Sequence, residues 1–230
     1  MYLSIIIPTL NEASNLYKLI PHLKSQLIKG QGELIVVDGG STDDTPAVAE
    51  QLVADLVLFS HQKGRASQMN FGARQAKGKI LYFVHADTLP PLSFWEDIRQ
   101  SMDLGYSAGT YRSKFDMDHP LLKINAYFTR FDRLFCRGGD QSLFITRDLF
   151  KELGGYRKDC LIMEEYHLIR ELRNRPHTLR IVPKETLISA RKYEERSYWR
   201  VNLANLYMVW LFYRGASQEY MVKTYRRLIN

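Results

Sequence analysis

The sequence predicts an α/β fold in which a mainly parallel central sheet carries helices on both faces. Through the first 90 residues, short β-branched or aromatic runs bounded by turn residues alternate with helical stripes of apolar residues. Such alternation is typical of right-handed parallel crossovers, which place helices on both sides of a sheet. The 230 residues are 45% apolar and 25% charged, a composition that excludes collagen-like, coiled-coil and disordered proteins.

The first half of the chain contains four expected strands and three expected helices. The strands cover residues 2–7, 33–38, 55–59 and 80–84. The first helix is indicated by apolar residues at helical spacing, namely Leu16, Leu19, Ile20, Leu23 and Leu27. The second begins at Thr45-Pro46, an N-cap followed by proline, and the third covers residues 66–76 and ends before Gly78.

The second half has a looser pattern after Pro90-Pro91. We expect helices over residues 93–102, 121–135 and 164–173, a short helix that ends at Gly154-Gly155, and one or two helices to the end of the chain. The expected strands cover residues 108–115, 142–146, 179–182 and 186–189. These elements predict one domain over residues 1–195, with halves 1–90 and 91–195, and a helical extension over 196–230.

Charge is distributed unevenly along the chain. The net charge is +7; residues 1–60 carry −4, from three Lys/Arg against seven Asp/Glu, and residues 61–230 carry +11, from 29 against 18. No signal peptide is visible, and residues 201–213 would span only about 20 Å as a helix, against about 30 Å for a membrane core. We therefore expect a cytoplasmic protein. Cys136 and Cys160 are expected to be reduced core thiols.

Polar residues follow each expected strand of the first half. Ligands of parallel α/β sheets bind beyond the carboxyl ends of the strands, so these exits are candidate binding residues. The exits are 8–12, 38–44, 61–65 and 85–88. Neither a G-x-G-x-x-G fingerprint nor a phosphate loop follows the first strand, which argues against a dinucleotide or P-loop site.

These exits carry motifs that resemble the family 2 glycosyltransferases of the GT-A fold. The motifs, in the family's order, are SIIIPTLNE (4–12), VVDGGSTD (36–43), HAD (85–87), GGY (154–156) and EE (164–165). The resemblance itself runs from about residue 3 to about residue 193. KGRASQMN (63–70) and GGDQ (138–141) are similar to a small bacterial branch of that family. The resemblance implies a GT-A catalytic domain over 1–195, with a nucleotide-sugar half (1–90) and an acceptor half (91–195).

The resemblance implies that Pro8, Thr9 and Glu12 line the pocket for the nucleobase and ribose, and that Asp38 accepts a hydrogen bond from the base. A buried carboxylate at a strand exit discriminates strongly against analogues that lack the hydrogen-bond donor. The alternative for Glu12 alone is a first-turn carboxylate stabilised by the helix dipole.

The resemblance also implies a divalent-cation site at the end of the fourth strand. The family has an Asp-x-Asp-type element there, and in this chain it reads His85-Ala86-Asp87. Asp87 is the predicted metal ligand, and His85 contacts the metal or the sugar donor, or is structural. Imidazole favours Mn²⁺ and leaves Mg²⁺ open. Lys63 and Arg65 precede a helix N-terminus that favours anions; the alternative is a solvated basic loop.

An inverting transfer needs a general base, which the family places in a Glu-Asp pair at the start of a helix. Here Glu165 occupies the aspartate position and is the predicted base, with Glu164 as the second candidate. Both could instead be exposed first-turn acids. Asp140 and Gln141 are candidates to bind acceptor or sugar-donor hydroxyls, or to form a turn. Arg191 and Lys192 could neutralise the leaving nucleoside diphosphate.

The sequence thus predicts an inverting, metal-dependent glycosyltransferase that uses a nucleotide-diphosphate sugar, by default a UDP-sugar, and an acceptor that could be lipid-linked. One alternative is a sugar-phosphate nucleotidyltransferase, although its Gly-rich loop is missing. The other is a basic protein that binds lipid or nucleic acid with a decayed active site. For the favoured function we expect no nucleic-acid partner.

The extension 196–230 combines apolar and basic residues. Residues 170–230 carry a net charge of +8, from 13 Lys/Arg against five Asp/Glu. A broad apolar surface is expected on the helix that Arg200 and Arg214 flank. It could lie peripherally on the anionic inner face of a membrane, pack on the catalytic domain, or pair with a second copy in a homodimer.

Overall fold

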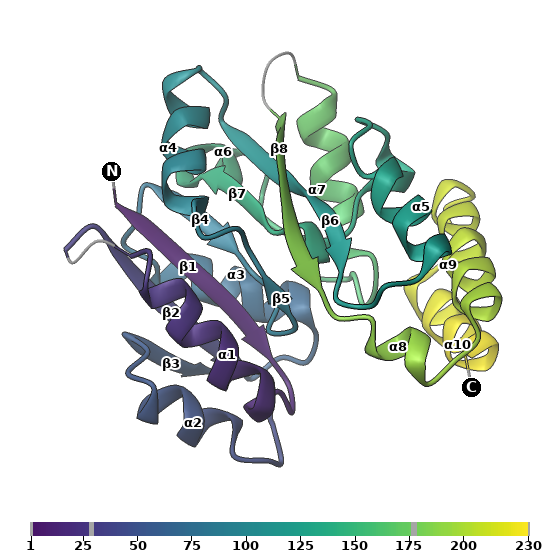
Figure 1. Ribbon diagram of the computed structural model, residues 1–230, viewed down its shortest axis with the longest axis horizontal. Coiled ribbons are helices and arrows are strands. Elements are labelled where there is room, and N and C mark those ends of the chain that lie inside the picture. The colour runs from purple at the N-terminus through teal and green to yellow at the C-terminus, as the bar shows by residue number, and fades with distance from the viewer. Residues whose placement is uncertain (1, 28–29, 176–178, 230) are drawn as a thin grey trace.

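The computed structural model describes residues 2–27, 30–175 and 179–229 and contains one eight-stranded sheet (Figure 1). The strand order is β3-β2-β1-β4-β7-β6-β8-β5. The strands are β1 (Leu3–Thr9), β2 (Gly32–Asp38), β3 (Leu56–Phe59), β4 (Ile80–Phe83), β5 (Thr88–Leu89), β6 (Ala108–Phe115), β7 (Leu143–Thr146) and β8 (Leu179–Ile188). Strands β1 to β4 are parallel to one another, which confirms the fold class predicted for the first half.

Helices connect these strands and form the extension. They are α1 (Ala13–Lys24), α2 (Thr45–Gln51), α3 (Arg65–Gln75), α4 (Phe94–Asp103), α5 (Pro120–Phe128), α6 (Arg147–Glu152), α7 (Glu164–Arg173), α8 (Arg191–Glu194), α9 (Tyr198–Tyr213) and α10 (Gln218–Ile229). Two 3₁₀ turns, η1 (Leu134–Cys136) and η2 (Gly139–Gln141), precede β7.

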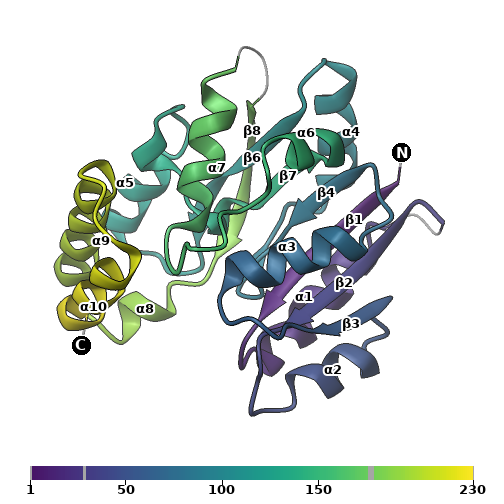
Figure 2. The ribbon, with the colours of Figure 1, turned by 180° about the vertical axis from the view of Figure 1, so that it is seen from behind.

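The helices cover both faces of the sheet, as predicted. One core packs α1, α2 and α4 against one face, and a second packs α3, α6 and α7 against the other. Figures 1 and 2 show these two layers from opposite sides. A third cluster joins α7 to α9 and α10 through Tyr166, Ile169, Met208, Phe212 and Met221. The extension therefore shares a core with α7.

The second half of the sheet is mixed: β6 and β8 are parallel to each other, and the remaining pairs there are antiparallel. Strand β7 is antiparallel to both β4 and β6, and β5 is antiparallel to β8. The two short strands expected at 179–182 and 186–189 form the single strand β8, because a bulge between the paired positions Val182 and Glu185 absorbs Pro183. Proline has no N–H to donate to a ladder, so a bulge accommodates it. Strand β5 was not expected.

Helix α5 is shorter than the helix expected over residues 121–135. Its end is fixed by side chains that bind main-chain groups at the turn. Thr129 donates to the carbonyl oxygen of Ala126 (2.6 Å) and accepts from the amide of Ser113 (2.9 Å), while buried Arg137 donates to the carbonyl oxygens of Thr129 and Phe131. These contacts satisfy polar groups that a continued helix would pair internally, so the chain turns instead.

Within the described residues, no helix is both long and apolar enough to span a bilayer. Cys136 and Cys160 are buried and unpaired, which confirms their prediction as core thiols.

Gly109 marks a close approach between β6 and β7. A Cβ at this position would lie 2.2 Å from the ring of the buried Phe144, its cross-strand partner. We expect Gly109→Ala to lower the free energy of unfolding by about 1–3 kcal/mol, the usual effect of overpacking a core. Gly138→Ala is the control, because its nearest new contact is 3.5 Å. Equal denaturant midpoints for the two variants would contradict the prediction.

Candidate active site

The loops that leave β1 and β2 are bound to each other at the carboxyl edge of the sheet. The amide of Asn11 donates to the Ser41 hydroxyl (2.9 Å), and the Asn11 side chain accepts from the amide of Thr42 (2.8 Å). Asn11 adopts a left-handed conformation, with φ 56°, which asparagine tolerates better than most residues. The first two motifs therefore fold into one rigid edge.

Asp38 and Thr9 are almost fully buried beneath this edge. One carboxylate oxygen of Asp38 accepts from the amides of Gly40 (2.8 Å) and Ser41 (2.9 Å), and the other accepts from the Ser41 hydroxyl. Gln68 in α3 donates to the carbonyl oxygen of Thr9 (2.7 Å) and so joins α3 to the end of β1. In this structure Asp38 organises the loop that follows it; its predicted contact with a nucleobase stays a prediction.

Glu12 connects the two halves of the site. Its carboxylate accepts from Asn15 (2.5 Å) and lies 3.6 Å from the guanidinium of Arg191, at the start of α8. Arg191 is more than half exposed, so this ion pair adds little stability. It does bring together a residue predicted for the nucleotide pocket and one predicted for the leaving group. Pro8 is buried in β1, beneath the same edge.

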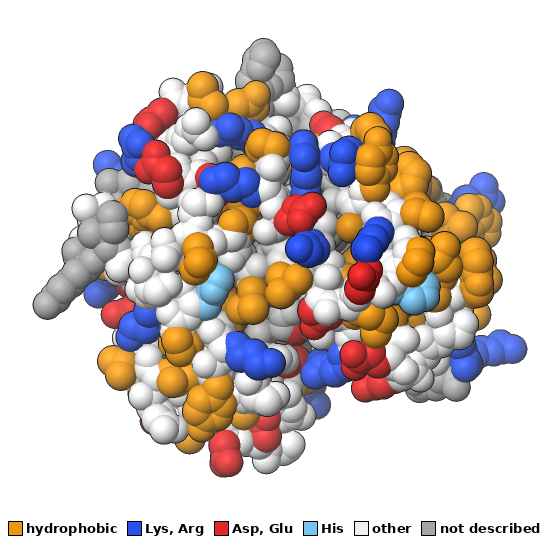
Figure 3. Space-filling model, viewed as in Figure 1, with side chains coloured by type: hydrophobic (Ala, Val, Ile, Leu, Met, Phe, Trp, Pro, Cys, Tyr) orange, Lys and Arg blue, Asp and Glu red, His pale blue; other side chains and the backbone are white. Residues whose placement is uncertain are grey.

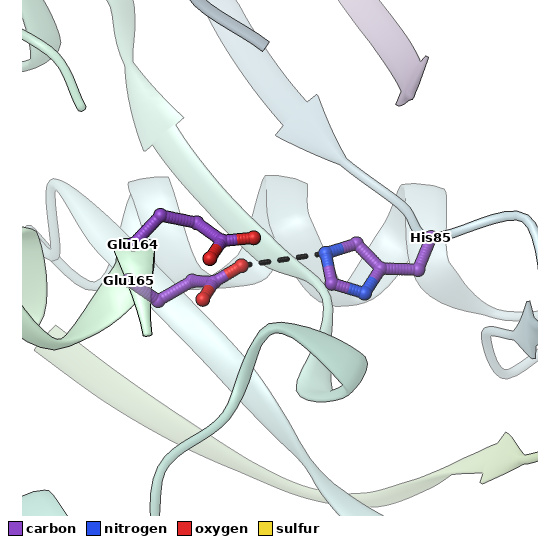
Figure 4. Close-up of side chains that lie close together, drawn as sticks. All are labelled: His85, Glu164 and Glu165. Atoms are coloured by element: carbon purple, nitrogen blue, oxygen red, sulfur yellow. Dashed lines mark ion pairs between the residues drawn. The ribbon is translucent and has the colours of Figure 1, made fainter. Parts of the chain in front are cut away.

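The centre of the site is formed by His85 with Glu164 and Glu165. His85 follows β4, and the two glutamates are the first residues of α7; all three are buried. Figure 4 shows the two carboxylates side by side and directed toward the imidazole, with Glu165 Oε1 3.3 Å from His85 Nε2. Burial lowers the pKa of His85, but Glu165 outweighs that effect and the net pKa shift is upward. The alternative that Glu164 and Glu165 are exposed first-turn acids is therefore wrong.

Glu164 is the carboxylate of the pair that more readily takes a proton. Burial and the neighbouring charge of Glu165 raise the pKa of Glu164 to about 7. Its partner is Arg65, whose Nε lies 3.6 Å from Glu164 Oε1 and whose side chain is 59% exposed. Arg65 is the first residue of α3, and its exposed side chain contacts the buried carboxylate of Glu164 from the solvent side.

Further charged groups surround this centre. Burial acts to raise the pKa of Asp140, but Lys192, His85 and Arg65 together lower it. Burial likewise opposes protonation of Lys192, yet Asp140 and, more weakly, Asp87 hold its pKa above the usual value. These shifts place Asp140 in η2, Lys192 in α8 and the half-buried Asp87 within one electrostatic neighbourhood.

The central residues offer a donor set that fits a divalent cation. Ligand atoms of His85, Glu164 and Glu165 lie within 4.8 Å of one another, and Asp87 follows two residues after His85. Glu164 Oε1 and Glu165 Oε1 are buried, and the contacts given for them in the described part of the chain are the ion pairs with Arg65 and His85. Imidazole and carboxylate ligands together suit Mn²⁺. The cluster joins His85 to the two glutamates, and the metal pair of His85 and Asp87 stays a prediction.

Lys63 and Gln141 have other surroundings than the sequence predicts. Lys63 is exposed and lines a separate hollow with Val222 and Arg226 of α10. Gln141 is buried and donates to the carbonyl oxygen of Cys136 (2.7 Å), which supports a structural role in the turn.

The loop before α7 is held by a residue that sequence analysis did not single out. Gln218, at the start of α10, accepts hydrogen bonds from the amides of Leu161 (3.0 Å) and Ile162 (3.2 Å). The next residue, Met163, has φ 55°, a strained conformation for a long side chain, and directly precedes Glu164. Such a long-range contact has no local sequence signal.

A cavity of about 720 Å³ opens beside the centre. Its lining includes Arg65, Asp140, Glu164, Glu165 and Lys192 at one end, together with residues of α5, α8 and α9. The cavity thus adjoins the pair of buried carboxylates.

Residues 4–161 match the sequence profile of Glycosyl transferase family 2. The chain belongs to this family. The match includes the motifs at the ends of β1, β2 and β4, whereas Glu164 and Glu165 lie just beyond it.

Relatives of this family 2 member include a "PGL/p-HBAD biosynthesis glycosyltransferase" of Mycobacterium bovis, which is 33% identical over 182 residues and covers 71% of this chain. Another is "Glycosyltransferase AglE" of Haloferax volcanii, 35% identical over 95 residues and 39% of this chain. The chain spans 66% of the mycobacterial relative and 31% of AglE.

Solved structures confirm the GT-A fold of this family member. Mannosyltransferase PcManGT from Pyrobaculum calidifontis, in complex with GDP-Man and Mn²⁺, aligns with a TM-score of 0.67 at 20% identity and covers 98% of this chain and 69% of its own. Staphylococcus aureus TarS 1-349, in complex with UDP-GlcNAc, aligns with 0.68 at 17% identity and covers 100% of this chain and 72% of its own.

The raised pKa of Glu164 predicts a change of stability with pH. Since the folded protein prefers Glu164 protonated, the stability this preference contributes is present below about pH 4.5, the ordinary pKa of the carboxyl group, and is lost as pH rises through about 7. Glu164→Gln removes that loss, so its melting temperature relative to the parent should rise between pH 4.5 and 8, measured in EDTA. Glu50→Gln, on the exposed face of α2, is the control. A difference that is constant with pH would contradict the prediction.

Proposed function

We propose that this family 2 glycosyltransferase transfers a sugar, with inversion, from a nucleotide-diphosphate sugar to an acceptor hydroxyl. The observation that carries the proposal is the pair of buried carboxylates, Glu164 and Glu165, at a helix N-terminus facing His85. A UDP-sugar is the default sugar donor. Family membership favours sugar transfer over the nucleotidyltransferase and the decayed binding protein that the sequence left open.

Glu165 is the proposed general base. It takes the proton of the acceptor hydroxyl while that oxygen attacks the anomeric carbon, and the bond from that carbon to the diphosphate oxygen breaks with its electron pair. Burial and the charge of Glu165 raise the pKa of Glu164 to about 7, so Glu164 is the neighbour that could take up a proton beside the proposed base. His85 orients Glu165 at 3.3 Å.

The remaining predicted residues fit the sugar donor. Pro8, Thr9, Glu12 and Asp38 form the edge proposed for the nucleobase and ribose. Arg65 and Lys192, with Arg191, are the residues proposed to neutralise the departing diphosphate; Lys63 lies farther from this centre. A divalent cation would add positive charge there, with Mn²⁺ favoured and Mg²⁺ an alternative. Asp87 and His85 would hold it, and the two glutamates lie within reach of His85.

The extension supports a peripheral position on the inner face of an anionic membrane, where a lipid-linked acceptor would be present. Helix α9 buries one face, through Val201, Ala204 and Leu211, on the rest of the chain. Its opposite face exposes Trp199, Leu203, Leu206, Trp210 and Tyr213. Figure 3 shows apolar side chains gathered over α5 and α9. Exposed aromatic residues with Arg200 and Arg214 at the helix ends suit an anionic interface.

Metal-assisted binding of the nucleotide is tested at Asp87. In calorimetry, UDP should bind more tightly with Mn²⁺ than with EDTA, and Asp87→Ala should remove that difference, because the carboxylate is the anchor proposed for the ion. Asp148→Ala, on the exposed surface of α6, should keep it. Equal affinity of the unmodified protein for UDP in both conditions would rule out the metal proposal.

The assignment of the base is tested by two matched variants. Glu165→Gln should lower kcat at least ~10²-fold without weakening UDP binding, because a positioned base contributes that much to rate. Glu164→Gln should have a smaller effect, because Gln imitates a protonated carboxyl. If Glu164→Gln loses more activity than Glu165→Gln, the base is Glu164.

Membrane association is tested by flotation with phosphatidylglycerol vesicles at low salt. The protein should float, and substitution of Trp199, Arg200 and Arg214 by Gln should abolish flotation by removing both apolar burial and charge attraction. A control with exposed Lys77, Leu104 and Lys151 changed to Gln should still float. An intact dimer by light scattering, with no flotation, would instead favour a homodimer through α9.

A further inference from the structure

The cavity beside Glu164 and Glu165 changes from charged to apolar along its length. At the catalytic end it is lined by Arg65, Asp140, Lys192 and the two glutamates. Its other walls come from α5, from the loop before α7, and from α8 and α9. With a volume of about 720 Å³, it falls in the upper part of the range for small-molecule sites.

The far wall consists of large apolar side chains that remain accessible. Leu203 and Leu206 of α9 are 62% and 65% exposed, and Trp199 is 64% exposed. Side chains of this size are usually covered in a folded protein, and a contiguous exposed group marks a binding surface. The wall continues with Phe128, Phe135, Leu161, Ile162, Tyr193 and Val209.

Several polar side chains of this wall already have hydrogen-bond partners within the protein. The side-chain amide of Asn125 donates to the side-chain oxygen of Asn202 (2.8 Å) and accepts from the Tyr198 hydroxyl (2.9 Å). The side-chain amide of Asn202 donates to the main-chain carbonyl oxygen of Tyr198 (3.0 Å). The guanidinium of Arg137, also in the lining, is taken up by Thr110, Thr129 and Phe131. A polyhydroxylated ligand needs hydrogen-bond partners that this wall has largely used.

We infer that this cavity binds the apolar portion of an amphiphilic acceptor, whose hydroxyl-bearing end lies at Glu164 and Glu165. The inference rests on the proposed sugar transfer and adds to it the position of the acceptor. The apolar wall, continuous with the two carboxylates, selects a hydrocarbon or aromatic body next to the reacting group. A sugar chain that extends along the same wall would leave its hydroxyls without partners.

The experiment uses n-alkyl β-glucosides as hydroxyl-bearing probes. Calorimetry below the critical micelle concentration compares glucose with hexyl, heptyl and octyl glucoside, in the presence of saturating UDP and Mn²⁺. Affinity should rise about fourfold with each added methylene, the usual effect of moving one buried CH₂ out of water. Maltotriose, which extends by sugar units, should bind no better than glucose.

Paired variants locate the binding site. Leu203→Gln with Leu206→Gln should flatten the rise in affinity with chain length, because the wall then presents amides to the chain. Gln preserves helix propensity and size, and circular dichroism verifies the fold. Leu104→Gln, at a leucine 60% exposed after α4 and outside the cavity lining, should retain the full rise.

The inference is overturned if affinity does not depend on alkyl length, if maltotriose binds as tightly as octyl glucoside, or if the double variant keeps the full rise. A dimer that covers α9 would give the first of these results. Failure of the unmodified protein to bind any of UDP, GDP, CDP and dTDP in a separate titration would instead overturn the proposed function, and the alkyl series repeated without nucleotide would still judge the cavity.

Discussion

The burial of two adjacent carboxylates at the start of α7 is the constraint around which the site is built. An unpaired buried charge costs several kcal/mol, and two like charges side by side cost more. Three features offset that cost in this chain: the N-terminal end of the α7 dipole, His85 at 3.3 Å from Glu165, and Arg65 at 3.6 Å from Glu164. Because each comes from a different element, α7, the end of β4 and the start of α3 must hold fixed positions relative to one another. The two apolar cores on either face of the sheet provide that rigidity.

The extension is part of this arrangement, since it contacts the loop that presents the carboxylates. Gln218 binds the amides of Leu161 and Ile162, and Met163 then turns through a left-handed conformation into α7. The apolar cluster that includes Phe212 and Met221 packs α9 and α10 against α7. Residues 196–230, expected as a separate extension, thus contribute to both the catalytic loop and the apolar wall of the cavity. The position of the proposed base and the shape of the proposed acceptor site depend on the same packed helices.

Sequence patterns predicted the features that arise from local chemistry. The alternation of apolar strands and helical stripes placed β1 to β4 and α1 to α3, and the polar strand exits placed His85 and Asp87 at the correct edge. The Glu164-Glu165 pair was found through its resemblance to the Glu-Asp pair of family 2 glycosyltransferases. Features created by tertiary contacts were missed: Arg137 ends α5 early, a bulge merges two expected strands into β8, and Gln218 acts from 57 residues away. The burial of Glu164 and Glu165 is of the same kind, because exposure depends on what packs over a helix end.

The charge balance of the site gives a physical reason why sugar donor and cation would bind together. Arg65 and Lys192 face Asp87, Asp140 and Glu165, so the named groups provide no surplus of positive charge, even with Glu164 protonated and neutral. A nucleoside diphosphate adds negative charge to the same region and would be repelled unless further positive charge arrived with it. Protonation of His85 supplies one unit, and its raised pKa, caused by Glu165, makes that possible. A protonated His85 is paired with Glu165, the proposed base. A His85 cation that attracts the diphosphate would therefore keep Glu165 in an ion pair. A divalent cation held by Asp87 and His85 would meet the same electrostatic need, and it would allow the site to hold an anionic sugar donor beside the proposed base.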